Sequence, residues 1–292
     1  MNELKCNDTY LSMEEMKINI ENIKTNISNY KNKETLINIL NFIDLTSLNS
    51  IDTKEEIRNL TTCINDFKDH FNNYKNVAAI CVYPSLVSVV KEEMKVDNVK
   101  IASVGGGFPS SQTFLSVKIA ECELAAYNGA DEIDIVIPIG EFLKKNYRRV
   151  IYEIQMIKNS IKADLKVILE TGELSTVENI YNASILSMES GADFIKTSTG
   201  KTPISATPEA VYIMCQAIKE FYKKTGKKIG IKPSGGISTS EDAILYYLIV
   251  KNVLGDEWLN NTLFRIGASR LTNKILSDLN KLEGKEEDIN YF

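Results

Sequence analysis

Three charged residues stand in segments that are otherwise apolar, where a buried strand should carry no charge. The segments "EIDIVIP", "DFIKTSTG" and "KIGIKPSGG" contain Asp134, Lys196 and Lys232, each beside isoleucines that occupy alternate positions. Because side chains alternate between the two faces of a strand, each charge lies opposite its isoleucines. In "LKVILE", Lys166 and Glu170 alternate with apolar residues in the same way. If the apolar faces contact outer helices, the charges point into a common interior.

Two lysines and a carboxylate brought together could carry out Schiff-base chemistry. A lysine amine with its ordinary pKa of about 10.4 is almost wholly protonated and cannot attack a carbonyl. Burial and a second cation both disfavour the ammonium and leave a neutral nucleophile. A nearby aspartate could then move protons during carbinolamine loss and enamine formation. The plain alternative is that the charges snorkel to water at a rim or form structural salt bridges.

Short glycine motifs follow three consecutive strand-like segments near the end of the chain. "STGK", "PSGG" and "GASR" present backbone N–H groups of the kind that bind phosphate in the last loops of α/β barrels. A plain turn explains any one of these motifs, and "GGGFP" earlier in the chain is best explained as a permissive loop. Their succession favours a phosphate site.

Eight β-like segments alternate with helical patterns and would position these residues. The segments are 41–46, 77–83, 99–104, 132–138, 165–170, 194–198, 228–232 and 263–267. Strands that alternate with helices are parallel and joined by crossovers. No linker or composition break divides the chain. The sequence therefore predicts an α/β protein, a single (β/α)8 TIM barrel over residues 39–283, with a polar C-terminal tail at 284–292.

Helix signals fill the gaps between the predicted strands. Thr53, Ser175 and Thr239 each precede an acidic residue by three positions, which is typical of a capping box. Thr207 is followed by a proline, which predicts that Thr207 is the N-cap of a helix. Residues 1–38 form a predicted N-terminal helical extension. Its apolar positions at helical spacing are Met16, Ile20, Ile23 and Ile27.

Bulk composition excludes several classes of protein. The chain has 292 residues and a net charge of −5, which argues against a nucleic-acid partner. No segment approaches the ~20 apolar residues of a membrane span, and the N-terminus has no apolar core of a signal peptide. We therefore expect no membrane association and a cytoplasmic location.

Cysteine and histidine usage limits the possible chemistry further. The five cysteines are odd in number and lack a CxxC pair, as expected of reduced thiols. They are Cys6, Cys63, Cys81, Cys122 and Cys215. The single histidine, His70, leaves no His-rich zinc site and no evident catalytic triad, and we expect it to be structural. No metal and no cofactor are predicted.

Seven segments, in order, resemble the deoxyribose-phosphate aldolase family from about residue 42 to residue 271. They are "AAICVYP", "GADEIDIVIP", "KVILETGEL", "GADFIKTSTGK", "ATPEA", "KPSGG" and "FRIGAS". The resemblance implies a class I aldolase barrel that reversibly cleaves 2-deoxy-D-ribose 5-phosphate to D-glyceraldehyde 3-phosphate and acetaldehyde, in deoxyribonucleoside catabolism. It implies Lys196 as the Schiff-base lysine, Lys232 as the residue that lowers its pKa, and Asp134 as the acid/base group.

The resemblance also implies the substrate-binding residues. The phosphate site corresponds to Gly200, Lys201, Gly235, Gly236 and Ser269. Asp44 and Cys81 would lie near the substrate in secondary roles. Arg270 departs from the family pattern, which often has a second serine there; its guanidinium either contacts the phosphate or points to solvent.

Two other functions stay open. One is a different Schiff-base aldolase, such as a transaldolase-like enzyme, and the other is a sugar-phosphate-binding barrel that has lost activity. The donor pocket separates the enzymes, because acetaldehyde needs only a small apolar cavity. Under each of these interpretations the partner is a small-molecule sugar phosphate, and a homo-oligomer is possible.

Overall fold

The computed structural model describes residues 13–292. Residues 1–12 lie outside the described part of the chain. Cys6 lies among these residues, and so does the start of the predicted extension at 1–38. The expectation that the N-terminus is not a signal peptide also concerns mainly these residues.

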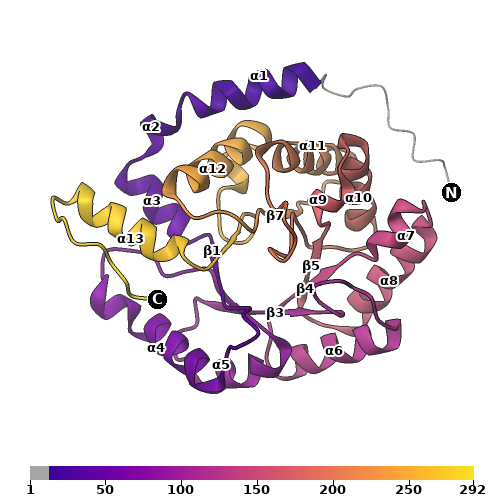
Figure 1. Ribbon diagram of the computed structural model, residues 1–292, viewed down its shortest axis with the longest axis horizontal. Coiled ribbons are helices and arrows are strands. Elements are labelled where there is room, and N and C mark those ends of the chain that lie inside the picture. Colours follow the sequence, from indigo (N-terminus) through magenta and orange to yellow (C-terminus); the bar gives the residue numbers. More distant parts are fainter. Residues whose placement is uncertain (1–12) are drawn as a thin grey trace.

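Eight strands form a nearly closed parallel barrel, as Figure 1 shows. They are β1 Ile43–Thr46, β2 Ala79–Val82, β3 Lys100–Gly105, β4 Glu132–Val136, β5 Asp164–Ile168, β6 Phe194–Lys196, β7 Gly230–Lys232 and β8 Ile266–Ala268. Hydrogen-bonded neighbours run in the order β7-β6-β5-β4-β3-β2-β1-β8, and two isolated bridges join the β7 and β8 segments. Each strand overlaps a predicted one, so the (β/α)8 barrel is confirmed.

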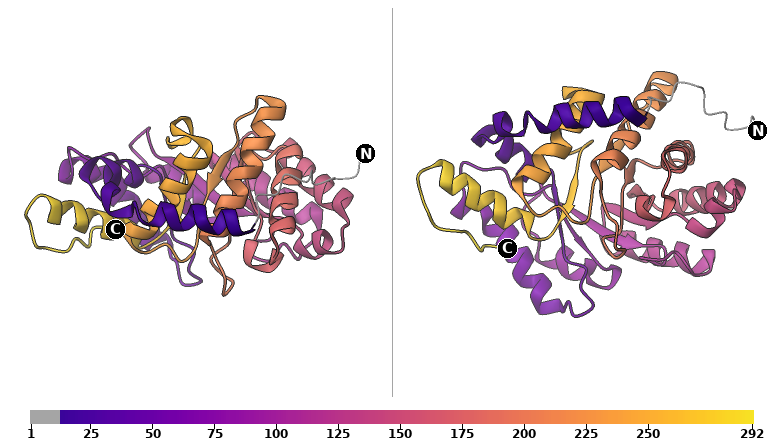
Figure 2. Two further views of the ribbon diagram at one scale, coloured as in Figure 1. Left: turned by 90° about the horizontal axis from the view of Figure 1, so that it is seen from above. Right: turned by 45° about the horizontal axis from the view of Figure 1, so that its top comes forward.

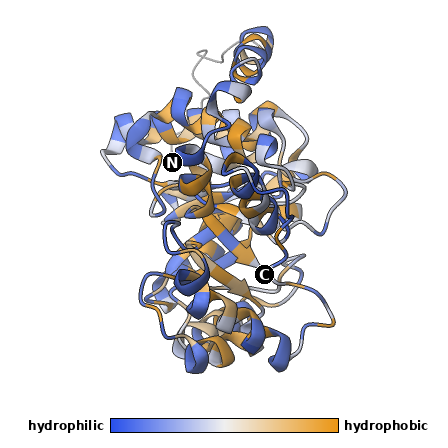
Figure 3. Ribbon diagram, turned by 90° about the vertical axis from the view of Figure 1, so that its left-hand side faces the viewer, coloured by the Kyte–Doolittle hydropathy of each residue, from blue (hydrophilic) through white to orange (hydrophobic). Residues whose placement is uncertain are grey.

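Thirteen α-helices are present among residues 13–292, and most of them lie outside the strands. They are α1 Met13–Lys24, α2 Ile27–Tyr30, α3 Lys33–Leu40, α4 Lys54–His70, α5 Val87–Glu93, α6 Leu115–Tyr127, α7 Ile139–Leu143, α8 Tyr147–Ser160, α9 Thr171–Leu174, α10 Val177–Glu189, α11 Pro208–Thr225, α12 Ser240–Leu254 and α13 Leu271–Leu282. Figure 3 shows the hydrophobic strands at the centre and more hydrophilic residues toward the outside. Both faces of each strand are covered, which explains their apolar sequences.

Helix starts follow the capping signals in three of four cases. Thr53 and Thr239 form capping boxes, and Thr207 accepts a hydrogen bond from the third residue of α11. The prediction at Ser175 is wrong. Its φ of 59° is left-handed, whereas an N-cap is normally extended, and Thr176 caps α10 instead.

The N-terminal helix packs against the outer helices α11 and α12, as the two views in Figure 2 show. Its buried residues are Met16, Ile20 and Ile23, as their helical spacing predicts. Ile27 does not continue that helix but begins the short α2. The extension therefore adds a layer to one side of the barrel.

The C-terminal tail returns to the barrel beside α4. Tyr291 donates a hydrogen bond from its hydroxyl to the carbonyl of Cys63 at 2.8 Å, and Phe292 stacks on Phe67. His70 is exposed at the end of α4, with its ring centroid 5.2 Å from that of Tyr291. The four cysteines between residues 13 and 292 are free.

Candidate active site

Asp134, Lys196 and Lys232 meet inside the barrel. Lys196 and Lys232 are paired across β6 and β7, and Asp134 lies on β4. The Asp134 Oδ2 atom is 2.8 Å from the Lys196 Nζ and 2.8 Å from the Lys232 Nζ. Lys196 is 3% exposed, and the other two are fully buried. The alternation of charged and apolar residues thus predicted which face of each strand points inward.

The surroundings of Lys196 favour its neutral amine. Burial lowers the pKa of Lys196 below its ordinary value of 10.5; the Asp134 carboxylate opposes this shift, and Lys232 adds to it. The neutral form is therefore more populated near neutral pH than for an exposed lysine.

The two partners of Lys196 keep their charges. Burial alone would raise the pKa of Asp134, but Lys196, Lys232 and Lys166 together hold it well below its usual range. Burial opposes the charge on Lys232, yet Asp134 and Asp44 raise the pKa of that lysine. Asp134 is consequently a carboxylate, and Lys232 an ammonium, beside the amine of Lys196.

Asp44 and Cys81 also lie in this interior, beside Lys232, and neither lines the cavity described below. The Asp44 Oδ2 atom is 2.5 Å from the Lys232 Nζ. Burial raises the pKa of the Cys81 thiol, which is fully buried and interacts electrostatically with Lys232 and Asp134. Cys81 therefore stays a neutral thiol beside the charged groups.

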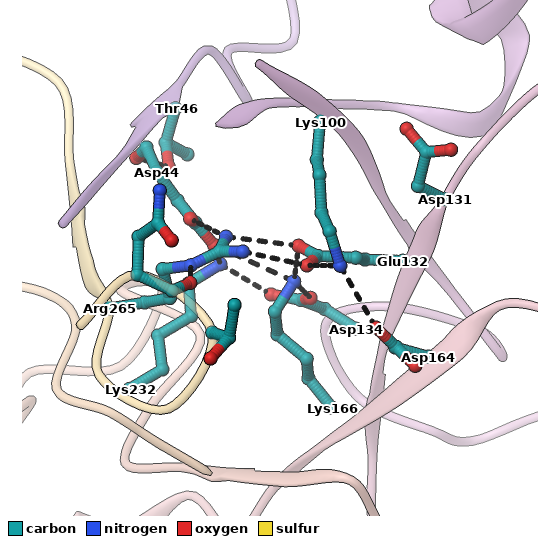
Figure 4. A network of polar contacts seen from close by, with 12 residues as sticks. Asp44, Thr46, Lys100, Asp131, Glu132, Asp134, Asp164, Lys166, Lys232 and Arg265 are labelled. Atoms are coloured by element: carbon teal, nitrogen blue, oxygen red, sulfur yellow. Dashed lines mark hydrogen bonds and ion pairs between the residues drawn. The ribbon is translucent and has the colours of Figure 1, made fainter. Parts of the chain in front are cut away.

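Glu132 and Arg265 were not singled out by the sequence, although both are buried in the same interior. Arg265 contacts both Glu132 and Asp44, and Lys166 donates a hydrogen bond to Glu132 (Figure 4). The spacing of two residues between Glu132 and Asp134 was a usable signal, because such residues share one face of a strand. Arg265 immediately precedes β8 and gave no comparable signal.

A cavity of about 790 Å³ opens above this interior at the carboxyl ends of the strands. Lys196 is one of the residues that line this cavity. The predicted phosphate-site residues Gly200, Lys201, Gly235, Gly236 and Ser269 all line it too, and so does Arg270. The structure thus brings the reactive lysine and the three glycine motifs to one site, at the end of the barrel where catalytic residues are usually found.

The loops after β6 and β7 approach each other so closely that a side chain is excluded. A Cβ atom at Gly235 would lie 2.5 Å from the Ser205 Oγ and 3.2 Å from the Gly200 Cα. Gly235 also has a φ of +84°, which favours glycine. The Ser234 hydroxyl donates a hydrogen bond to the Ser198 carbonyl at 2.5 Å. These contacts hold the two loops together at the mouth of the cavity.

Charged side chains at the cavity mouth differ in their partners. The Lys201 Nζ donates a hydrogen bond to the Leu48 carbonyl at 2.5 Å, so it bridges across the cavity to the loop after β1. Ser269 and Arg270 are exposed and precede α13. The N-terminal N–H groups of a helix favour an anion, which suits this end of the cavity to a phosphate.

A small apolar cluster lines the opposite side of the barrel interior. Its buried members come from β2, β3 and the loop after β1, and Tyr83 and Phe108 pack against them. The buried members are Leu48, Ala79, Cys81, Ala102 and Val104. Ala79 and Ala102 have small side chains, and this part of the interior is apolar.

Metal-binding clusters and membrane-spanning helices are both absent from residues 13–292. These residues contain no group of three or more His, Cys, Asp or Glu side chains placed to hold a metal ion. Among the helices of the same residues, none is long and apolar enough to span a membrane.

Comparison with known proteins identifies the family. The model of the DeoC/LacD family aldolases matches residues 38–250. Human deoxyribose-phosphate aldolase is 41% identical over 251 residues, which cover 82% of this chain and 79% of the human protein. The mouse deoxyribose-phosphate aldolase is 40% identical with the same coverage. A solved structure described as QR15, an aldolase, is 30% identical, with a TM-score of 0.69 over 83% of this chain and 96% of that one. This chain therefore belongs to the DeoC/LacD family of aldolases.

Proposed function

We propose that this protein is a class I aldolase that reversibly cleaves 2-deoxy-D-ribose 5-phosphate to D-glyceraldehyde 3-phosphate and acetaldehyde. The observation that carries the proposal is the Lys196 amine, buried between Asp134 and Lys232 and open to a cavity lined by glycine loops. The names of the relatives support the substrate.

The first half of the reaction forms the Schiff base. The neutral Lys196 amine attacks C1 of the open-chain sugar, so that an N–C bond forms and the carbonyl oxygen gains a proton. The carbinolamine then loses water to give an iminium. Asp134 lies 2.8 Å from the Lys196 Nζ and exchanges the protons, directly or through water.

The second half breaks the carbon–carbon bond. A base removes the proton of the C3 hydroxyl, and the C2–C3 bond breaks toward the iminium, which releases glyceraldehyde 3-phosphate and leaves an enamine on Lys196. Protonation of the enamine carbon and hydrolysis of the imine release acetaldehyde. In this scheme Asp134 serves the proton transfers near the imine, and Lys232 stays charged and disfavours the ammonium form of Lys196. The chemistry needs neither metal nor cofactor.

The remaining residues are proposed to bind the substrate. Gly200, Lys201, Gly235, Gly236 and Ser269 would hold the 5-phosphate, with Asp44 and Cys81 nearer the reacting carbons. The small apolar cluster with Ala79 and Ala102 favours acetaldehyde over the larger donors of other Schiff-base aldolases.

A cytoplasmic location and a homo-oligomer stay predictions. The structure of the Aeropyrum pernix deoxyribose phosphate aldolase, which is 26% identical to this chain, is described as tetrameric. Its TM-score is 0.67, over 88% of this chain and 97% of that one.

Borohydride trapping tests the proposal directly. Incubation with acetaldehyde and borohydride should add a two-carbon group to Lys196, located by mass spectrometry. Lys196→Arg should abolish both the adduct and cleavage, because arginine keeps the charge but cannot form the imine. An adduct mainly on Lys166 or Lys232 would refute the assignment. A trapped adduct without any cleavage of deoxyribose 5-phosphate would favour another donor or acceptor.

A further inference from the structure

Seven charged side chains form one connected set inside the barrel. Each is at most 3% exposed. They are Asp44, Glu132, Asp134, Lys166, Lys196, Lys232 and Arg265. They come from six of the eight strands or from the residue just before one, and Figure 4 shows how closely most of them gather.

Six of the seven close into a ring in which positive and negative groups alternate. Starting from Asp134, its Oδ1 is 3.5 Å from the Lys166 Nζ, and Lys166 donates a hydrogen bond to Glu132. The Glu132 Oε1 is 2.8 Å from the Arg265 Nη2.

The ring closes through Asp44. The Arg265 Nη1 is 2.6 Å from the Asp44 Oδ1, and the Asp44 Oδ2 is 2.5 Å from the Lys232 Nζ. Lys232 in turn lies 2.8 Å from the Asp134 Oδ2. We call these three carboxylates and three cations the charge ring; its net charge is zero.

Lys196 is the seventh member and stands outside the ring. Its ion-pair partner is Asp134, and that carboxylate already lies between the two ring cations Lys166 and Lys232. With Lys196 neutral, the buried charges balance. A protonated Lys196 would leave one uncompensated positive charge among buried groups, which is costly.

We propose that Glu132 and Arg265 are positioning residues that complete the charge ring, and that the balance of this ring favours the neutral amine of Lys196. Neither residue lines the substrate cavity, so both act through the field at Lys196 rather than by contact with substrate. The inference rests on the proposed role of Lys196.

Other titratable groups surround the ring. The Cys81 thiol on β2 faces Lys196, Lys232 and Asp134, and it is neutral because burial raises its pKa. Lys100 on β3 contacts the Glu132 Oε1 at 3.1 Å but is 40% exposed, and it also pairs with Asp164 at 3.0 Å. Water screens that outer pair. Glu170, after β5, accepts a hydrogen bond from the Thr199 hydroxyl.

Opposite changes to the ring should move the pH dependence in opposite directions. At low pH kcat/KM falls as Lys196 becomes protonated, and we call this part of the pH profile the acid limb. Glu132→Gln leaves the ring with one excess positive charge, so the acid limb should move to lower pH. Arg265→Met leaves one excess negative charge, so the limb should move to higher pH. Each displacement should be on the order of one pH unit. The double variant E132Q/R265M restores the balance and should return the limb to within about half a pH unit of wild type.

Controls separate charge from structure. Arg265→Lys keeps the charge and should keep the limb. Lys158→Met breaks the Lys158–Asp193 ion pair, 2.6 Å long and outside the ring, and should also leave the limb in place. The pH dependence of trapping of Lys196 by acetaldehyde and borohydride gives a second readout of the same ionisation.

Several results would overturn the inference. Single variants that shift the limb in the same direction, or not at all, would show that the ring does not set the charge of Lys196. If the single variants do not fold, the double variant and Arg265→Lys decide, and a shifted limb in either one refutes the inference. Absence of a Lys196 adduct in the wild-type protein would instead refute the proposed function.

Discussion

The two sides of the barrel interior differ sharply in chemistry. The side formed by β4 to β8 and β1 buries seven charged groups, whereas β2 and β3 present alanines, a thiol and a valine, with the half-exposed Lys100 as their one charged group facing the ring. Buried charges are costly unless paired, while small apolar side chains fill space at little cost. In the proposed function the charged side carries the reaction, and the apolar side, of which Leu48 lines the cavity, would shape the pocket of a small donor.

The largest effect on the pH dependence of the reaction is expected from a change on the charged side that removes a cation next to Lys196. Lys232→Leu should raise the pKa of Lys196, because Lys232 helps to lower it. The reactive amine is neutral above its pKa, so kcat/KM rises with pH and levels off, and the variant's acid limb should move to higher pH. If the limb moves by about one pH unit, the rate at a fixed pH below the limb should fall about tenfold.

The pH–rate profile of Lys232→Leu measures this change. Lys228→Leu serves as a matched control, since Lys228 pairs with the exposed Glu257 outside the barrel interior. A profile unchanged from wild type would remove Lys232 from its proposed role.

A selective effect is expected at the cavity mouth, which belongs to neither side. Lys201→Leu or Ser269→Trp should weaken catalysis on deoxyribose 5-phosphate by about ten- to a hundredfold, because one charged phosphate contact is worth roughly 1.5–3 kcal/mol. The slower reaction of unphosphorylated deoxyribose should change much less. The measurement is the ratio of the two kcat/KM values.

Arg270→Ser belongs in the same series. A selective loss would place its guanidinium on the phosphate, whereas no change would leave it in solvent. Equal losses on both substrates for Lys201→Leu and Ser269→Trp would mean that these loops support the fold rather than bind phosphate.

A change on the apolar side should affect the donor more than the acceptor. Ala102→Val adds two methyl groups to the cluster around Cys81, and overpacking of this kind costs about 1–3 kcal/mol. We expect the KM for acetaldehyde in the synthetic direction to rise several-fold, with the KM for glyceraldehyde 3-phosphate nearly unchanged. Ala125→Val, in the buried face of α6 away from the cavity, controls for a loss of stability, which thermal unfolding measures. Equal changes in both KM values would contradict a donor pocket at this position.

The smallest effect is expected from a chelator. Activity should survive prolonged incubation with EDTA, because lysine and carboxylate groups suffice for the proposed chemistry. Loss of activity with EDTA, restored by Zn²⁺, would contradict the proposed metal-free mechanism.

The sequence predicted the parts of this arrangement that depend on local spacing. Asp134, Lys196 and Lys232 were found because each breaks an apolar alternation within one strand. The glycines of the late loops were found by their order along the chain. Each of these signals is confined to a short segment, and the structure brings them together as the barrel closes.

The parts that sequence reasoning missed depend on contacts between distant segments. Arg265 is separated by 133 residues from Glu132 and by 221 residues from Asp44, and no local pattern links such residues. The wrong cap at Ser175 has a different cause. Ser175 and Thr176 are both good capping residues, and the left-handed backbone at Ser175 decides between them.

The charge ring has a consequence for how the chain folds. Its members are supplied by five strands or strand edges spread from Asp44 to Arg265, so no contiguous half of the barrel contains a complete ring. Leaving out any one contributing strand leaves a buried charge without its partner, at a penalty of about 3–5 kcal/mol. Partly closed barrels are therefore disfavoured relative to the finished fold. The same groups that prepare Lys196 for reaction make closure of the barrel cooperative.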